Sequence, residues 1–302
     1  MKKIKFIPHA DLCKGHRNGW IYVSKGIVEH LHTGYGLDFY SWVDGLIREH
    51  EIIYPWTGFI HNVISYPKEY PHKYRPEVIY SLEQLVKQPR FHRALSKCQG
   101  IFTLCNYTRD FLQKHTVVPV ETIYHPCPKF AEYKKCDNRV IFIGQHMRKY
   151  HSFLDLKLPP RFKKVMVKVL RNQADYKEML QYAASDSVEF VSSLSNAEYD
   201  FLLVSSIVFL DFYDVAACNV VLECIMTNTP LVVRRMPALE EYLGKEYPLF
   251  FNSLDEAEIL VTKAQEGAEY FRSMDKTKFS IDYFIQAIKD SSIYKSIKTV
   301  LL

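Results

Sequence analysis

The feature that most constrains this fold is an alternation of short apolar runs with helical patterns, which starts twice along the chain. The first series opens with an apolar run over 4–7, a loop that contains glycine and a helical pattern over 20–31. A polar stretch with two prolines over 126–138 interrupts it, and a second series starts at 139–144. Because strands that alternate with helices form mainly parallel sheets, the sequence predicts an α/β protein with two such units.

Length and composition agree with two globular units and argue against several classes of protein. The 302 residues are enough for two cores, and no block of like charge resembles a nucleic-acid-binding arm. The net charge of +5 is mild and permits contact with nucleotides or with the surface of a membrane. Seven scattered cysteines without a Cys-x-x-Cys pair indicate reduced thiols rather than a disulfide framework or a zinc site. With no signal-peptide pattern and no stretch long enough to span a bilayer, we expect a cytoplasmic protein.

The segment 214–233 carries the clearest chemical pattern. A strand leads into a loop, and a helix begins near Asn219. The free N–H groups of a helix N-terminus suit a diphosphate, and Asn219 is a suitable cap for this helix. Glu223 lies one turn further on, where its carboxylate is able to accept both hydroxyl groups of a ribose. The alternative is that Glu223 is a solvated glutamate in the first turn of the helix.

Basic residues follow the first strand of the second series. Gly144 ends that strand, and Arg148 and Lys149 come soon after it. Ligands of parallel sheets bind beyond the carboxyl ends of the strands. We therefore expect Arg148 to make a bidentate contact with a phosphate and Lys149 to make a point-charge contact. A solvated basic turn is the alternative.

Two weaker signals lie in the first series. Gly15 and Gly19 flank a loop whose backbone could approach a ligand closely, and a plain tight turn is an equal alternative. His61 follows the strand predicted over 57–60 and is expected to point into a cleft between the two units. There its imidazole would form a hydrogen bond, stabilise charge or act as a base, whereas a structural role is the alternative.

The order of these elements resembles the donor-binding region of GT-B glycosyltransferases, in the group that carries a Glu-x7-Glu motif. Glu223 matches the second glutamate of that motif, and the segment 229–233 matches the strand that follows it. The first glutamate would fall at Val215, so the neighbouring Asp214 is the candidate substitute. The resemblance implies two Rossmann-like domains with mainly parallel sheets. These are an acceptor domain over 1–127, a nucleotide-sugar donor domain over 128–275, and a helix over 276–302 that crosses back to the first domain.

The resemblance also implies a reaction, in which a sugar passes from a nucleoside diphosphate sugar to an acceptor hydroxyl of a glycan or glycoconjugate. A UDP-sugar is the favoured donor and a GDP-sugar is the alternative. No metal is required, since basic side chains and a helix N-terminus would neutralise the leaving diphosphate. The implied site comprises Glu223 at the ribose, Arg148, Lys149, Asn219 and Val220 at the phosphates, Gly15, Gly19 and Gly144 beside the donor, and His61 and Asp214 as catalytic residues.

Two rival functions stay open at this point. One is a glycosyltransferase that acts on nucleic acid, which the mild positive charge permits but the lack of a basic arm makes unlikely. The other is a scaffold that kept the fold after losing activity, because the loop before Glu223 departs from the motif. The sequence does not determine the base, the sugar, the stereochemistry of transfer or the oligomeric state.

Overall fold

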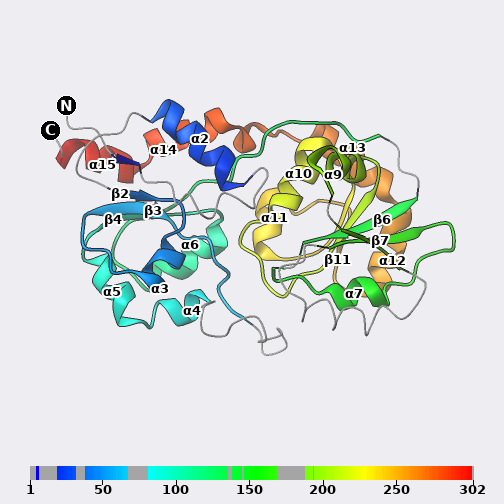
Figure 1. Cartoon of the computed structure of the whole chain (residues 1–302), viewed down its shortest axis with the longest axis horizontal. Helices are drawn as coiled ribbons and strands as arrows, with labels where there is room; N and C mark the ends of the chain where they lie inside the picture. The colour runs from blue at the N-terminus through cyan, green and yellow to red at the C-terminus, as the bar shows by residue number, and fades with distance from the viewer. Residues whose placement is uncertain are drawn as a thin grey trace. The chain divides into compact units, whose positions relative to one another are not determined.

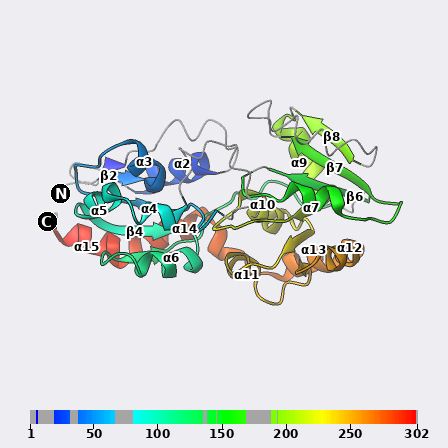
Figure 2. The ribbon, with the colours of Figure 1, turned by 90° about the horizontal axis from the view of Figure 1, so that it is seen from below.

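The described chain forms two compact units (Figures 1 and 2). The first unit takes in 1–128, 214–219 and 276–302, and the second takes in 129–213 and 220–275. The loop 214–219 therefore packs with the first unit, although the chain around it belongs to the second. The computed structural model describes residues 5–6, 19–31, 38–66, 81–134, 138–144, 146–168, 188–192 and 194–300.

The first unit is built on a parallel sheet of five strands in the order β1-β2-β3-β4-β5. These strands are β1 (Lys5–Phe6), β2 (Asp38–Tyr40), β3 (Trp56–Phe59), β4 (Cys98–Thr103) and β5 (Val120–Thr122). Its helices are α2 (Trp20–His30), α3 (Val43–Glu49), α4 (Leu82–Leu85), α5 (Pro89–Leu95), α6 (Asn106–Gln113), α14 (Ile281–Asp290) and α15 (Ser292–Val300), with a short 3-10 turn at Thr277–Phe279.

Helices cover both faces of this sheet (Figure 1). Successive side chains of a strand point to opposite faces, and in β4 both Ile101 and Phe102 are almost fully buried. Phe102 belongs to the core cluster that includes residues of α2, α14 and α15. Ile101 belongs to a second cluster, with residues of α3, α4, α5 and α6. The C-terminal helices thus complete the core of the first unit.

The second unit contains a parallel sheet of six strands in the order β11-β10-β9-β6-β7-β8. The order reverses between β6 and β9, as in a Rossmann sheet. Its strands are β6 (Arg139–Ile143), β7 (Lys163–Lys168), β8 (Val188–Ser192), β9 (Ile207–Leu210), β10 (Leu231–Arg234) and β11 (Phe250–Phe251). Its helices are α7 (Tyr150–Asp155), α9 (Asn196–Val204), α10 (Asn219–Thr227), α11 (Pro237–Leu243), α12 (Leu254–Thr262) and α13 (Ala264–Ser273).

An aromatic stack forms part of the core of the second unit. Phe209 lies at the centre of the sheet, with its ring centroid 5.3 Å from that of Phe251 and 5.8 Å from that of Phe153. Phe153 of α7 in turn lies 5.4 Å from Phe142 of β6. These rings are fully or almost fully buried. Strands that are apolar on both faces are expected in a parallel sheet that helices cover on both sides.

The structure refines several sequence-based expectations. The sequence pattern over 77–98 predicts a long helix or a helix pair, and its described part, 81–98, forms the pair α4 and α5. Pro89 takes the first position of α5, where a missing N–H has no cost. The final helical pattern also forms two helices, since α14 ends before Ser291 and α15 starts after it. The helix predicted over 175–184 and the loop around Gly15 lie outside the described residues.

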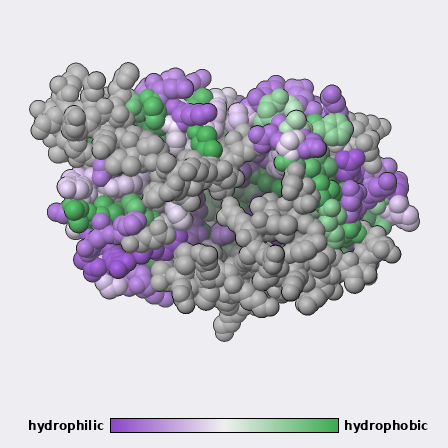
Figure 3. Space-filling model, in the orientation of Figure 1, coloured by the Kyte–Doolittle hydropathy of each residue, from purple (hydrophilic) through white to green (hydrophobic). Residues whose placement is uncertain are grey.

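Polar and apolar side chains are interspersed on the surface seen in Figure 3. Large exposed apolar side chains occur singly on several elements, such as Val28 on α2, Phe201 on α9 and Ile259 on α12. Scattered exposure of this kind is normal for a globular protein. No helix in the described part of the chain is long and apolar enough to cross a bilayer.

Candidate functional site

The site in the second unit is defined by the strand order of its sheet. From β6 the chain proceeds to β7 on one side, and from β9 it proceeds to β10 on the other. The connections that leave β6 and β9 therefore lead to opposite sides of the sheet, and the region beyond the carboxyl ends of the strands at such a switch point is the usual ligand site of an open α/β sheet. The loop after β6 contains Gly144 and Arg148, and the chain after β9 leads to α10 and Glu223.

The side chain of Arg148 is folded over its own loop. Its Nε donates to the carbonyl of Ile143 at 3.1 Å, and its Nη1 donates to the carbonyl of His146 at 2.9 Å. Gly144 has a φ of +89°, and a Cβ there would lie 3.2 Å from Nη2 of Arg148. Glycine therefore allows both the left-handed backbone and the close approach of the guanidinium.

The loops after β6 and β9 are paired with each other. Arg148 forms an antiparallel bridge with Phe212, the Lys149 N–H donates to the Asp211 carbonyl at 2.9 Å, and the Tyr213 N–H donates to the Met147 carbonyl at 2.9 Å. The Arg148 guanidinium lies 4.6 Å from the centroid of the Phe212 ring, and Lys149 Nζ lies 5.2 Å from that of Tyr213. Both predicted phosphate-binding cations are thus held at the switch point by cation–π contacts.

Glu223 is a buried residue of α10 and is only 4% exposed, so it is not the solvated glutamate of the alternative interpretation. Its Oε2 accepts a hydrogen bond of 2.7 Å from the hydroxyl of Tyr199 in α9. A buried carboxylate is costly unless it is hydrogen-bonded, and this contact fixes its orientation. The sequence analysis did not single out Tyr199, which lies 24 positions before Glu223.

Asp214 lies within the first unit and is 7% exposed. Its Oδ2 accepts from the backbone N–H groups of Ile64 at 3.1 Å and Ser65 at 3.3 Å, and its Oδ1 accepts from the N–H of Val215 at 2.8 Å. Burial raises the pKa of this carboxyl, and the three N–H contacts oppose the rise. The contacts give the carboxylate a structural task, which is to hold the loop 214–219 against the segment after β3.

The remaining predicted donor-site residues lie at the beginnings of helices or outside the described residues. Asn219 is the first residue of α10, so it follows the cap position that the sequence suggested for it, and Val220 is the next helical residue. Gly19 occupies the N-cap position of α2, and its φ of −84° and ψ of −127° lie outside the main allowed regions of non-glycine residues. Gly15 lies outside the described residues.

His61 lies beyond the carboxyl end of β3, where the sequence placed it. The indole N–H of Trp20 donates to its Nε2 at 3.4 Å, and its Nδ1 lies 3.9 Å from Oδ1 of Asp44. Asp44 is 2% exposed and also accepts from the indole N–H of Trp42 at 3.2 Å. Burial raises the pKa of Asp44 to about 6, against the opposing effects of its hydrogen bonds and of Arg48. Asp44 and Trp20 were not predicted, because their positions relative to His61 depend on the tertiary fold.

A second ion pair lies at the carboxyl edge of the six-stranded sheet. Asp211 follows β9, is fully buried and accepts from both Nε and Nη2 of Arg234 at the end of β10, the latter at 2.9 Å. The guanidinium also donates to the Asn252 carbonyl at 2.9 Å and lies 5.0 Å from the centroid of the Phe251 ring. This bidentate pair fastens three neighbouring strand ends beside the switch point.

Among the residues that the structure describes, no group of three or more histidine, cysteine, aspartate and glutamate side chains is placed to hold a metal ion. Arg148 and Lys149 are positively charged side chains in the loop that follows β6.

No protein-family model and no curated protein sequence matches this chain. Its fold, however, matches solved structures. Alr3699/HepE of Anabaena, in complex with UDP and glucose, gives a TM-score of 0.66 at 13% identity over 92% of this chain and 81% of its own. TarM of S. aureus, in a complex that contains UDP, gives 0.59 at 11% identity over 88% of this chain and 54% of its own. The UDP-forming trehalose-phosphate synthase of Burkholderia xenovorans gives 0.56 at 9% identity over 83% and 72%.

These similarities confirm the predicted fold class, two Rossmann-like α/β units in the GT-B architecture. At such low identity they establish the fold and not the reaction. The chain spans about half the length of TarM, so the activity of that longer protein is not transferred to it as a fact.

Proposed function

We propose that this protein is a glycosyltransferase that moves a sugar from a nucleoside diphosphate sugar to a hydroxyl of a glycan or glycoconjugate. The observation that carries the proposal is the buried Glu223 carboxylate, held at 2.7 Å by the Tyr199 hydroxyl in the unit that contains the switch point. The Tyr199 contact fixes the orientation of the carboxylate, and an ionised carboxylate accepts hydrogen bonds through both of its oxygens. The proposed role of Glu223 is to accept the two hydroxyl groups of the donor ribose.

The proposed diphosphate site uses Arg148, Lys149 and the backbone of Asn219 and Val220. Arg148 and Lys149 are already held in place by contacts within the second unit, so little side-chain freedom is lost when an anion binds. Fixed positive groups of this kind stabilise the charge that develops on the departing diphosphate, which is how the reaction would proceed without a metal.

A UDP-sugar is the proposed donor. Its support is that HepE, TarM and the trehalose-phosphate synthase are described with UDP, UDP-glucose or UDP formation, and they share the fold of this chain. A GDP-sugar is the alternative donor. The proposed acceptor is a glycan, since fondaparinux accompanies UDP in the TarM complex.

His61 is the proposed contact of the reacting sugar. Trp20 and Asp44 hold its ring, and a fixed imidazole is suited to a hydrogen bond or to proton transfer. We assign Asp214 to the loop rather than to the reaction, because its carboxylate accepts three backbone N–H groups.

The second candidate is a nucleotide-binding scaffold without transferase activity. It is favoured by the same contacts of Asp214, since the residue nearest to the first glutamate position is occupied in holding the loop. Assaying the release of UDP from UDP-glucose and UDP-N-acetylglucosamine, with and without EDTA, separates the two candidates. We expect release that EDTA does not change and that Glu223→Gln lowers. Tight UDP binding without release from any UDP-sugar or GDP-sugar would support the scaffold.

A further inference from the structure

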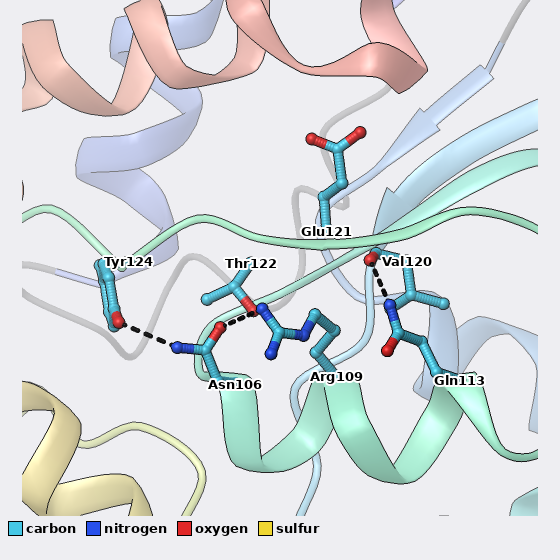
Figure 4. Close-up of a pocket in the computed structure, with 7 residues that line it drawn as sticks. All are labelled: Asn106, Arg109, Gln113, Val120, Glu121, Thr122 and Tyr124. Atoms are coloured by element: carbon cyan, nitrogen blue, oxygen red, sulfur yellow. Dashed lines mark hydrogen bonds between the residues drawn. The ribbon is translucent and has the colours of Figure 1, made fainter.

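An open pocket of about 500 Å³ lies in the first unit beside the edge strand β5 (Figure 4). This volume falls within the ~300–1,000 Å³ range of ligand sites. Strand β5 is at the end of the sheet, so its outer side is not paired with another described strand. The pocket is lined by Asn106, Arg109 and Gln113 of α6 and by Val120, Glu121, Thr122 and Tyr124 of the β5 segment.

The polar groups of this pocket hold one another in fixed orientations. Arg109 Nη1 donates to Asn106 Oδ1 at 2.6 Å, and Asn106 Nδ2 donates to the Tyr124 hydroxyl at 3.4 Å (Figure 4). Gln113 Nε2 donates to the carbonyl of Val120 at 3.3 Å. The Arg109 guanidinium and the Gln113 amide have more donors and acceptors than these contacts use. The pocket therefore presents a preset row of both donors and acceptors.

The lining of the pocket carries one cation, Arg109, and one anion, Glu121, so it has no excess of positive charge. Arg109 donates from Nε and Nη2 to the same oxygen of Asp110, at 2.9 and 2.7 Å. Glu121 points away from Arg109 in Figure 4, and its Oε1 accepts from the Ser292 hydroxyl at 2.7 Å and from the Ile293 N–H at 3.2 Å. A site for a phosphate or a nucleic acid would need an excess of positive charge. The compensated lining instead favours a neutral, strongly hydrogen-bonding ligand.

The lining residues of the pocket follow the course of strand β5. The pocket extends along β5 from Val120, the first residue of the strand, to Tyr124, which lies beyond its end. Asn106 follows the carboxyl end of β4, and His61 follows that of the neighbouring β3. An extended ligand in this pocket would therefore run towards the edge of the sheet on which His61 lies.

We propose that this pocket binds a neutral oligosaccharide. Sugar hydroxyl groups both donate and accept, which matches a row of amides, a guanidinium and hydroxyls better than an apolar ligand does. Resting on the proposed transferase function, this oligosaccharide is the acceptor glycan, whose reacting end would be directed to the carboxyl edge of the sheet. Binding of the oligosaccharide itself needs no donor.

Saturation-transfer NMR with maltoheptaose, cellohexaose, chitohexaose and a sulfated heparin hexasaccharide tests the proposal on the whole protein without a donor. We expect transfer to at least one neutral oligosaccharide and an affinity that rises with chain length. The double variant Arg109→Ala/Gln113→Ala and the milder Tyr124→Phe should each lower that affinity, the former about tenfold or more. The exposed Lys114→Ala, at the C-cap of α6, serves as the control and should bind as the wild type does.

Thermal stabilisation by UDP, measured on the same variants, separates this proposal from the donor site. Unchanged UDP stabilisation together with lost oligosaccharide binding supports the pocket as a separate subsite. The proposal would be overturned if no neutral oligosaccharide bound, or if only the heparin hexasaccharide bound. It would also be overturned if the pocket variants bound the neutral oligosaccharide with the affinity of the wild type. If UDP does not stabilise the wild type, the proposed transferase function is contradicted. The proposal for the pocket is still tested, because oligosaccharide binding is measured without a donor.

Discussion

The Tyr199 hydroxyl donates a hydrogen bond of 2.7 Å to the carboxylate of Glu223, and this contact joins α9 to α10 in the second unit. It gives a carboxylate that is only 4% exposed a hydrogen-bond partner and a fixed orientation. We propose that the Glu223 carboxylate accepts the hydroxyl groups of a donor ribose, and Tyr199 fixes its orientation for that contact.

Replacing Glu223 by Gln should weaken UDP binding about ten- to a hundredfold, since a hydrogen bond to a charged group contributes about 1.5–3 kcal/mol. Tyr199→Phe should have a smaller effect, because it loosens the carboxylate without removing it. Isothermal titration with UDP measures both. The exposed Glu246→Gln is the matched control, and normal binding by Glu223→Gln would remove Glu223 from the site.

Arg148→Lys should also weaken UDP binding, by about tenfold or more. A lysine cannot bond the carbonyls of Ile143 and His146 together and still present a planar fork to a phosphate. The same substitution at the exposed Arg161, outside the loop, should leave the affinity unchanged. Equal affinities for the two variants would show that Arg148 serves only its own loop.

Much of the fold follows from local sequence patterns. The strands β6 and β9 are short apolar runs, which is typical of buried parallel strands. Helix α11 begins at Pro237 and ends before Gly244, which has a φ of +85°. The position of Glu223 in a helix after a strand is local in the same sense. Such features depend on neighbours in the sequence, so they can be read from it.

The partners within the site could not be predicted in this way. Tyr199 lies 24 positions from Glu223, Arg234 lies 23 from Asp211, and Ile64 lies 150 from Asp214. Each pair depends on strand order and helix packing, which periodicity does not specify. The structural task of Asp214 was missed for this reason, since its three N–H donors become visible only when the loop is packed.

The buried Asp44 predicts a dependence of stability on pH. Its pKa is raised from 3.8 to about 6 in the folded state, so the folded protein binds a proton more readily than the unfolded chain does. Between about pH 4 and pH 6 the free energy of unfolding should therefore fall as pH rises, by up to about 3 kcal/mol. Asp44→Asn should remove this slope in urea unfolding measured across that range.

His61 is the nearest titrating neighbour of Asp44, so the same comparison is made in a His61→Gln background. In that background, the fall in the free energy of unfolding between pH 4 and pH 6 that Asp44 causes should persist. The free energy of unfolding of the wild type is compared with that of Asp44→Asn at each pH. If this difference is constant or rises from pH 4 to pH 6, the raised pKa of Asp44 is contradicted.

Gly100 should not tolerate a side chain. Its φ is +156°, and a Cβ there would lie 2.5 Å from Cγ1 of Ile293 in α15. We expect Gly100→Ala to lower the free energy of unfolding by about 1–3 kcal/mol through overpacking and backbone strain. Denaturant unfolding measures the loss.

The double variant Gly100→Ala/Ile293→Ala tests the cause of that loss. Because the smaller residue makes room for the new methyl group, the two losses should not add. If the two losses of unfolding free energy added fully, a clash between the new methyl group and Ile293 would not be the cause of the destabilisation.

The most direct test of a nucleotide-sugar donor site is thermal stabilisation by UDP, GDP, ADP and CMP at saturating concentration, on the wild type and on Glu223→Gln. We predict that UDP stabilises the wild type selectively, by about 2.7 kcal/mol at ~100 times its Kd, and that the variant loses most of this effect. No stabilisation by any of the nucleotides, or the same stabilisation of the variant by UDP, would contradict a donor site built around Glu223.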